Sequence, residues 1–245
     1  MYSTHFWHLL HIYRNKIARI VVLALFIPLS SMGQEAFQYN LPFSDAKWLH
    51  YGFSIGLHTS SFQLKYSDAF TTPEMDSVHS IMPAPAFGFS LGFITDFRLA
   101  DQFNIRVLPK VSFYEFPVDY NYTDGRIDKQ LIEATYVEIP ILIKYKSERH
   151  KNFRVYFVGG ISPGMEVSGK KRKEQSDDRL LTQDLNLNVE MGMGIDMYYP
   201  LFKFSPEIRF SKGLPNILKE DKYGYSDGIQ SLRMNVVTLY LQFSD

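Results

Sequence analysis

The side chains of this sequence that could do chemistry are charged residues that alternate with apolar ones. They occupy one parity of several segments, and a period of two places them on one face of successive β-strands. The acidic members are Asp96, Glu138, Glu166, Glu190, Asp196 and Glu207, and the basic members are Arg98, Arg106, Lys110, Lys144, Arg154, Lys203 and Arg209. Because the two signs nearly balance, we expect these residues to form a salt-bridged network. A selectivity lining or a proton path is the alternative.

No pattern in the sequence indicates a metal site, a cofactor or a catalytic residue. The chain has no cysteine, and His50 and His58 lie on one predicted strand. Eight residues of strand separate them by about 26 Å, so they cannot share a metal ion. The pair of Ser54 and His50 on the same strand is better explained by packing. A membrane lipid enzyme remains an alternative, because catalytic geometry is not visible in residue order.

Strict alternation defines eight strands. In the first, residues 49–58 (LHYGFSIGLH), large apolar residues at odd positions alternate with small or polar residues at even positions. The other seven strands cover residues 87–99, 103–113, 136–145, 153–167, 185–199, 202–210 and 233–243. Within the fifth strand, the GGISPG segment at residues 159–164 predicts a bend or a bulge.

The lengths of the connections predict how the strands are arranged. Short connections, around residues 100–102, 146–152 and 200–201, alternate with long ones, around residues 66–83, 117–130, 168–184 and 214–231. Outer-membrane barrels combine an even number of strands with short periplasmic turns and long outer loops. The alternation of short and long connections therefore predicts an up-and-down meander with all long loops at one end.

In a soluble barrel, the apolar side chains of each strand would face the interior, and the polar ones would face water. The composition of the two strand faces therefore distinguishes a soluble barrel from a membrane barrel. The polar parity is rich in glycine and serine, which suit a narrow lumen better than a water-exposed surface. The apolar parity carries aromatic residues next to the short turns, as in the girdle at a membrane interface. These are Phe97, Phe103, Tyr145, Phe153, Tyr199, Phe202 and Phe243. We predict an all-β, eight-stranded antiparallel up-and-down transmembrane β-barrel, with the apolar parity facing lipid.

The N-terminal residues predict export. Residues 1–33 contain Arg14, Lys16 and Arg19 but no acidic residue, then the apolar run at residues 20–29 and small residues before Gln34. This is the pattern of a secretory signal peptide, and the apolar run is too short for a membrane-spanning helix. We predict a signal peptide at residues 1–33, a periplasmic segment at 34–46 and a barrel domain at 47–245, located in the outer membrane.

Charge also constrains the partners. A formal net charge of zero gives no bulk attraction for nucleic acid. The long connection at residues 168–184 begins with Lys170, Lys171, Arg172 and Lys173. This basic run could bind lipopolysaccharide phosphates or an acidic partner, or it could simply be solvated. The expected partners are outer-membrane lipid and lipopolysaccharide, together with other envelope or secretion-system proteins.

Two segments resemble a known family. TYVEIPILIKYK at residues 135–146, followed by FVGGISPG at 157–164, is similar to the outer-membrane β-barrel family of Bacteroidetes, and within it to the PorT proteins. The resemblance covers most of residues 47–243 and brings no catalytic residue. It implies an accessory role in protein secretion of the type IX system. The alternative is a generic small barrel with a structural or ligand-binding role.

Overall fold

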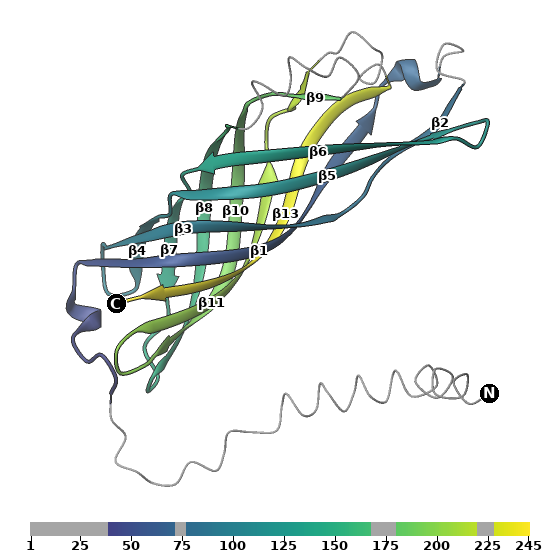
Figure 1. Ribbon diagram of the computed structural model, residues 1–245. Coiled ribbons are helices and arrows are strands. Elements are labelled where there is room, and N and C mark those ends of the chain that lie inside the picture. Colours follow the sequence, from purple (N-terminus) through teal and green to yellow (C-terminus); the bar gives the residue numbers. More distant parts are fainter. Residues whose placement is uncertain (1–38, 72–76, 168–179, 220–227) are drawn as a thin grey trace, which may run out of the picture. The chain divides into compact units, whose positions relative to one another are not determined.

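The computed structural model describes residues 39–71, 77–167, 180–219 and 228–245 (Figure 1). The predicted signal peptide and the basic run at Lys170, Lys171, Arg172 and Lys173 lie outside the described residues. Among the described residues, no helix has the length and apolar character needed to span a bilayer. The described residues form two short 3-10 helices, η1 (Ser44–Ala46) in the predicted periplasmic segment and η2 (Asp68–Thr71) after the first strand.

Strands make up most of the described chain. The long ones are β1 (Leu49–Tyr66), β3 (Ala86–Arg98), β5 (Lys110–Tyr122), β6 (Ile127–Glu138), β8 (Phe153–Glu166), β10 (Leu185–Tyr198), β11 (Lys203–Gly213) and β13 (Ile229–Ser244). The short ones are β2 (Val78–Pro83), β4 (Phe103–Val107), β7 (Ile141–Lys146), β9 (Leu181–Thr182) and β12 (Leu218–Lys219). Alternation of buried and exposed residues runs through the long strands, as period-two folding requires.

Two of the spans are interrupted at proline. Pro109 separates β4 from β5, and Pro140 separates β6 from β7, because proline has no N–H to donate to a ladder. The chain stays in the wall at both breaks. The backbone N–H of Phe93 donates to the Pro109 carbonyl at 2.9 Å, and that of Leu108 donates to the Pro140 carbonyl at 3.0 Å. Each interrupted pair of strands therefore acts as one span.

The spans form a closed antiparallel ring. The main sheet has 11 strands, which make eight spans because β4 with β5 and β6 with β7 each count once and β2 pairs only with β5. Around the ring, β1 pairs with β3, and β3 pairs with both β4 and β5. Next, β4 pairs with β7 and β5 pairs with β6, and both β6 and β7 pair with β8. The ring continues through β10, β11 and β13 back to β1. The predicted eight-stranded up-and-down barrel is confirmed.

Three details differ from the prediction. The predicted loop at residues 117–130 is largely strand, because β5 continues to Tyr122 and β6 begins at Ile127, with a turn at Gly125 whose φ is 86°. β1 likewise continues to Tyr66. No bulge occurs in β8, whose register with β10 is unbroken from Phe153 to Met165. Gly160 is instead needed for close approach, since an added Cβ would lie 2.1 Å from the Ile141 carbonyl oxygen.

The extended parts of β5, β6 and β2 project beyond the rest of the barrel at the end opposite the short turns (Figure 1). In β5 the inward residues Phe116, Val118 and Tyr120 are buried, and Glu115 points outward. The outward face of β6 is mixed, because Glu133 alternates with the exposed Leu131. We call this part, residues 78–83 and 114–134, the outer extension. The charged residues on its outward face place this part beyond the hydrocarbon of the membrane.

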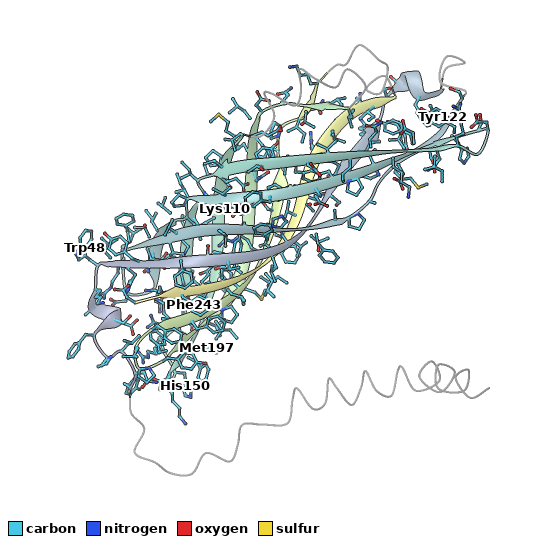
Figure 2. All side chains as sticks on the ribbon, in the orientation of Figure 1. Trp48, Lys110, Tyr122, His150, Met197 and Phe243 are labelled. Carbon is cyan, nitrogen blue, oxygen red and sulfur yellow. The ribbon has the colours of Figure 1, made fainter. Side chains whose placement is uncertain are left out.

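The interior of the barrel therefore has two layers. The layer nearer the short turns contains charged side chains, and the layer nearer the outer extension is an apolar core. The core consists of Phe62, Ile81, Tyr114, Phe116, Val118, Tyr120, Ala134, Tyr136, Leu180, Ile217, Ile229, Leu232, Met234 and Val236. Figure 2 shows Lys110, a member of the charged layer, between Trp48 and His150 at one end and Tyr122 at the other.

Candidate functional site

The buried charged layer is the largest cluster of ionisable groups in the described chain. Its residues lie on β3 to β7, β10 and β11. They point inward because their neighbours in each strand, which point to the opposite face, form the apolar exterior. Ten of the predicted residues are buried there: Asp96, Arg106, Lys110, Glu138, Lys144, Glu190, Asp196, Lys203, Glu207 and Arg209. We refer to these ten residues as the lumen cluster.

Arg106 connects two carboxylates of the lumen cluster. Its Nε and Nη2 donate to the two oxygens of Asp96 at 2.6 and 2.8 Å, which is a bidentate pair. Its Nη1 donates to Glu207 at 3.1 Å and to the amide oxygen of Gln242 at 2.7 Å. The hydroxyl of Tyr156 donates to the same Glu207 oxygen at 2.9 Å. One guanidinium thus joins β3, β4, β11 and β13 across the lumen.

Lys110 and Arg209 form the second part of the lumen cluster. Lys110 Nζ lies 3.2 Å from a Glu138 oxygen and 3.5 Å from a Glu190 oxygen, and it donates to the Tyr240 hydroxyl at 2.9 Å. Arg209 donates to Glu190 at 3.0 Å and through Nε to Glu207 at 2.7 Å. Because Glu207 also accepts from Arg106, the two parts are continuous.

The third part lies closer to the short turns. Lys144 Nζ donates to both oxygens of Asp196 at 2.9 and 2.8 Å, and Ser205 donates to the same carboxylate at 2.6 Å. The Lys144 ammonium also lies 3.7 Å from the centre of the Tyr156 ring. Lys203 is buried at the same level, without an ion pair to a described acidic residue. Every carboxylate of the lumen cluster therefore faces at least one cation.

At the periplasmic mouth, the segment before β1 joins the barrel interior. Asp45 of η1 accepts from Arg154 Nη1 at 2.8 Å and from the Tyr198 hydroxyl at 3.2 Å. At the other terminus, Asp245 follows β13 and pairs with Lys47 at 2.8 Å. Partial burial raises the pKa of Asp245, but hydrogen bonds from Lys47 and from the Tyr51 backbone outweigh this effect and lower it. Arg154 thus belongs to a separate mouth contact.

Two predicted members of the network lie elsewhere. Arg98 is at the end of β3, where its side chain is 30% exposed and pairs with Asp101 of the following turn. Its assignment to the lumen was wrong, because parity gives the face of a strand but not the depth at which a residue sits. Glu166 is half-buried at the other end of the barrel, where its ladder partner is Tyr136.

Sequence reasoning missed the neutral partners of the lumen cluster. Tyr156, Tyr240, Gln242 and Ser205 all donate to or accept from its charges. Each shares the inward parity of its strand, so that parity was the available signal. Asp45 was missed because it precedes the first strand and has no pattern to mark it.

The described residues offer no support for a metal or serine site. Among them, no group of three or more His, Asp or Glu side chains could hold a metal ion. Gly160 to Gly164 has the spacing of the GxSxG motif, but that motif needs a strand-to-helix turn. Ser162 instead lies inside β8, where it is buried and its ladder partner is Asn188. The sequence analysis overlooked this motif, and its context in the strand excludes a nucleophile elbow.

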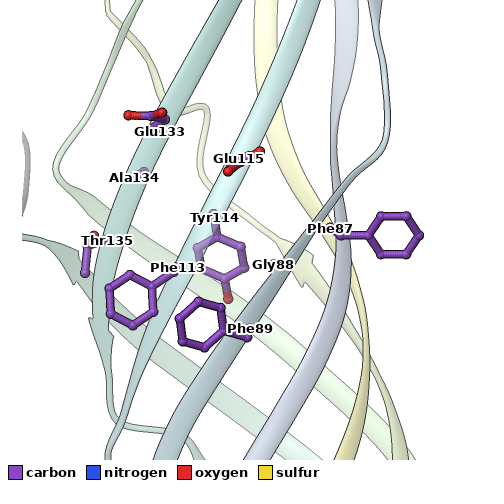
Figure 3. Close-up of a pocket in the computed structure, with 9 residues that line it drawn as sticks. All are labelled: Phe87, Gly88, Phe89, Phe113, Tyr114, Glu115, Glu133, Ala134 and Thr135. Atoms are coloured by element: carbon purple, nitrogen blue, oxygen red, sulfur yellow. The ribbon is translucent and has the colours of Figure 1, made fainter.

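The described wall has a weak point above the lumen cluster. β3 and β5 pair only from Phe89 with Phe113 to Gly92 with Lys110. Beyond these pairs lies a cavity of about 340 Å³ (Figure 3). It is lined by Phe87, Gly88, Phe89, Phe113, Tyr114, Glu115, Glu133, Ala134 and Thr135.

Side chains from β1 reach across this weak point. His58 Nε2 lies 3.1 Å from the Phe113 carbonyl oxygen, and Ser60 Oγ donates to the Glu115 carbonyl at 3.0 Å. Gly88 makes the first contact possible, since a Cβ there would lie 2.3 Å from both the His58 ring and the Phe113 oxygen. His58 and Ser60 thus replace part of the missing ladder.

The comparisons with known proteins identify the family. The model of the outer membrane protein beta-barrel domain matches residues 35–219. The chain belongs to this family. The protein is accordingly an outer-membrane protein, and the predicted localisation is confirmed. No curated protein matches the chain.

Three solved structures illustrate the similarity. The outer membrane protein OprG from Pseudomonas aeruginosa is 15% identical, with a TM-score of 0.45, over 80% of this chain and 95% of that one. Neisserial surface protein A is 12% identical, with a TM-score of 0.38, over 78% and 95%. Ail of Yersinia pestis, in complex with the heparin analogue sucrose octasulfate, is 10% identical, with a TM-score of 0.34, over 81% and 100%.

Proposed function

We propose that the protein is a non-conducting barrel that acts by binding other envelope components, and not as a channel or an enzyme. The observation that carries this proposal is the filled interior. The lumen cluster occupies one layer and the apolar core the next, so a solute would have to displace both. Eight-stranded barrels are narrow enough for side chains to fill. The outer surfaces are then the parts available for function.

The outer extension is the surface best suited to a protein partner. It presents Glu115, Asp119, Lys129 and Glu133 on its outward face. Its inward face packs into the apolar core, where Phe62 and Phe116 stack with ring centres 4.0 Å apart. A polar surface held by such packing is preorganised, which lowers the entropic cost of binding.

We further propose that the bound partner belongs to a protein secretion machinery. The support is the resemblance of residues 135–146 and 157–164 to the PorT proteins, which implies an accessory role in type IX secretion. A generic structural barrel is the second candidate, and it is supported by the extensive internal pairing of the lumen cluster.

Gene deletion followed by comparison of secreted proteins separates these candidates. The secretion role predicts that specific proteins disappear from the medium and return when the wild-type gene is restored. Unchanged secretion with a weakened envelope would favour the structural role. A changed lipid A or phospholipid profile, with no loss of secreted proteins, would contradict both and indicate a lipid enzyme.

Site-specific crosslinking tests the docking surface directly. A photoreactive amino acid in place of Lys129, on the outer extension, should crosslink to a protein in living cells. The same amino acid in place of Phe157, which points outward from the middle of β8, should crosslink to lipid instead. Absence of any protein adduct from several outward positions of the extension would refute the docking role.

A further inference from the structure

The lipid-facing wall over β10, β11 and β13 contains an apolar groove. Its volume is about 460 Å³. It is lined by Val189, Met191, Phe210, Ser211, Lys212, Leu214, Asn235, Val236 and Val237. The exposed apolar side chains among these residues would contact hydrocarbon in the membrane.

The groove crosses the outer edge of the apolar band. In the ladder between β11 and β13, the outward pair Phe210 and Val237 is followed by the outward pair Lys212 and Asn235. On β1, Ser61 is the ladder partner of Asn235 and is polar as well. On β13 and β1 the wall thus changes from apolar to polar within one outward residue, whereas on β10 it stays apolar through Val189 and Leu187. The groove crosses this change.

Basic side chains lie above the groove. Lys212 lines it. Arg233 is the next outward residue of β13 after Asn235, and Lys65 is the outward residue of β1 that follows Gln63, the ladder partner of Arg233. All three are exposed, and no acidic side chain of the described residues forms an ion pair with them. The sector of β11, β13 and β1 above the apolar band is therefore positively charged.

This charge is not a uniform ring around the barrel. On the opposite side, the outward residues just above the apolar band are Glu115 and Glu133, which are ladder partners. If basic residues only anchored the barrel in the membrane, the outward residues just above the apolar band should be basic on this opposite side as well. The coincidence of the basic residues with the groove indicates a ligand that is both apolar and anionic.

We propose that the groove binds an acyl chain of a phosphorylated outer-leaflet lipid of the lipid A class, and that Lys212, Arg233 and Lys65 bind its phosphates. Long basic side chains at the edge of the hydrocarbon extend their charged ends to the headgroup level. Each one near an anionic lipid surface strengthens binding by about fivefold.

Native mass spectrometry of the mature protein, taken from phosphatidylcholine nanodiscs that contain a small fraction of diphosphorylated lipid A, tests the proposal. Wild-type protein should retain lipid A. Lys212→Gln should lower retention about fivefold, and the triple variant Lys65→Gln, Lys212→Gln, Arg233→Gln at least tenfold. Lys129→Gln removes a basic residue from the opposite sector and should change nothing. The heat-dependent gel shift checks that every variant is folded.

Further arms separate the acyl chain from the phosphate. Val237→Phe fills the groove and should lower retention, whereas Val155→Phe, on the outward face of β8, should not. Dephosphorylated lipid A should be retained poorly, and inorganic phosphate should not displace the lipid. The proposal is overturned if Lys212→Gln retains lipid A like the wild type, if Lys129→Gln loses as much, or if free phosphate displaces the lipid.

Discussion

At the residue scale, Arg106 shows why the lumen cluster is vulnerable to single changes. It is 1% exposed and pairs with two carboxylates at once. Removing one partner of a buried ion pair leaves the other charge without compensation, which costs more than the pair itself contributes. The same logic does not apply to Arg98, which is 30% exposed beside an almost fully exposed Asp101.

We therefore predict that Arg106→Met lowers the free energy of unfolding by about 3 to 5 kcal/mol, because Asp96 and Glu207 lose their shared cation. Arg98→Met is the matched control and should cost less than about 1 kcal/mol, as expected for an exposed pair. Urea unfolding of both variants in the same detergent measures the difference. Equal losses would mean that Arg106 is not buried among carboxylates.

Gly88 allows a second test at this scale. Gly88→Ala should lower stability by about 1 to 3 kcal/mol, because the new methyl group would overlap the His58 ring and the Phe113 carbonyl. Gly159→Ala is the matched control on another strand, where the nearest atom to the added Cβ is 3.9 Å away. Urea unfolding should show a loss for the first variant only. A silent Gly88→Ala would remove the reason for a glycine at the weak point of the wall.

At the element scale, period-two patterning was enough to predict the spans but not their lengths. Apart from Thr95, the outward residues of 87–97 are apolar, so the membrane-facing part of β3 was recognised. In β5, the outward residues become polar after Phe113 while the inward ones become apolar. The alternation continues, but its sense is reversed because the strand has left the hydrocarbon. A search for apolar residues on the lipid face therefore ended too early.

This reversal predicts that an arginine on the outward face has different effects inside and beyond the apolar band. Phe89→Arg places a guanidinium in hydrocarbon and should cost up to about 2 to 4 kcal/mol, the figure for the midplane. Glu115→Arg lies beyond the apolar band, on the outer extension, and should be nearly silent. Phe89→Leu controls for the loss of the ring. The amount of heat-modifiable barrel in the outer membrane reports assembly, and normal assembly of Phe89→Arg would show that position 89 does not face lipid.

At the scale of the whole molecule, two closures lie in series along the barrel axis. The charged closure depends on ion pairs such as Lys144 with Asp196, and the apolar closure depends on residues such as Phe116, Leu232 and Met234, which carry no charge. The sequence indicated the first closure through its balanced charges. It did not indicate the second, because inward apolar residues of the outer extension look like the outward residues of a membrane strand.

The two closures make a prediction that distinguishes a plug from a selectivity lining or a proton path. Purified protein in planar bilayers should conduct little at neutral pH, because ion pairs and tyrosines fill the lumen. Acidic solution that protonates carboxylates would weaken only the charged closure, so conductance should stay low at acidic pH as well. A proton path would instead carry current there, which liposomes with an entrapped pH dye would reveal as rapid dissipation of a pH gradient. Stable conductance comparable to that of an open porin at either pH would show that the apolar core does not close the barrel, and the binding role proposed for its outer surfaces would lose its foundation.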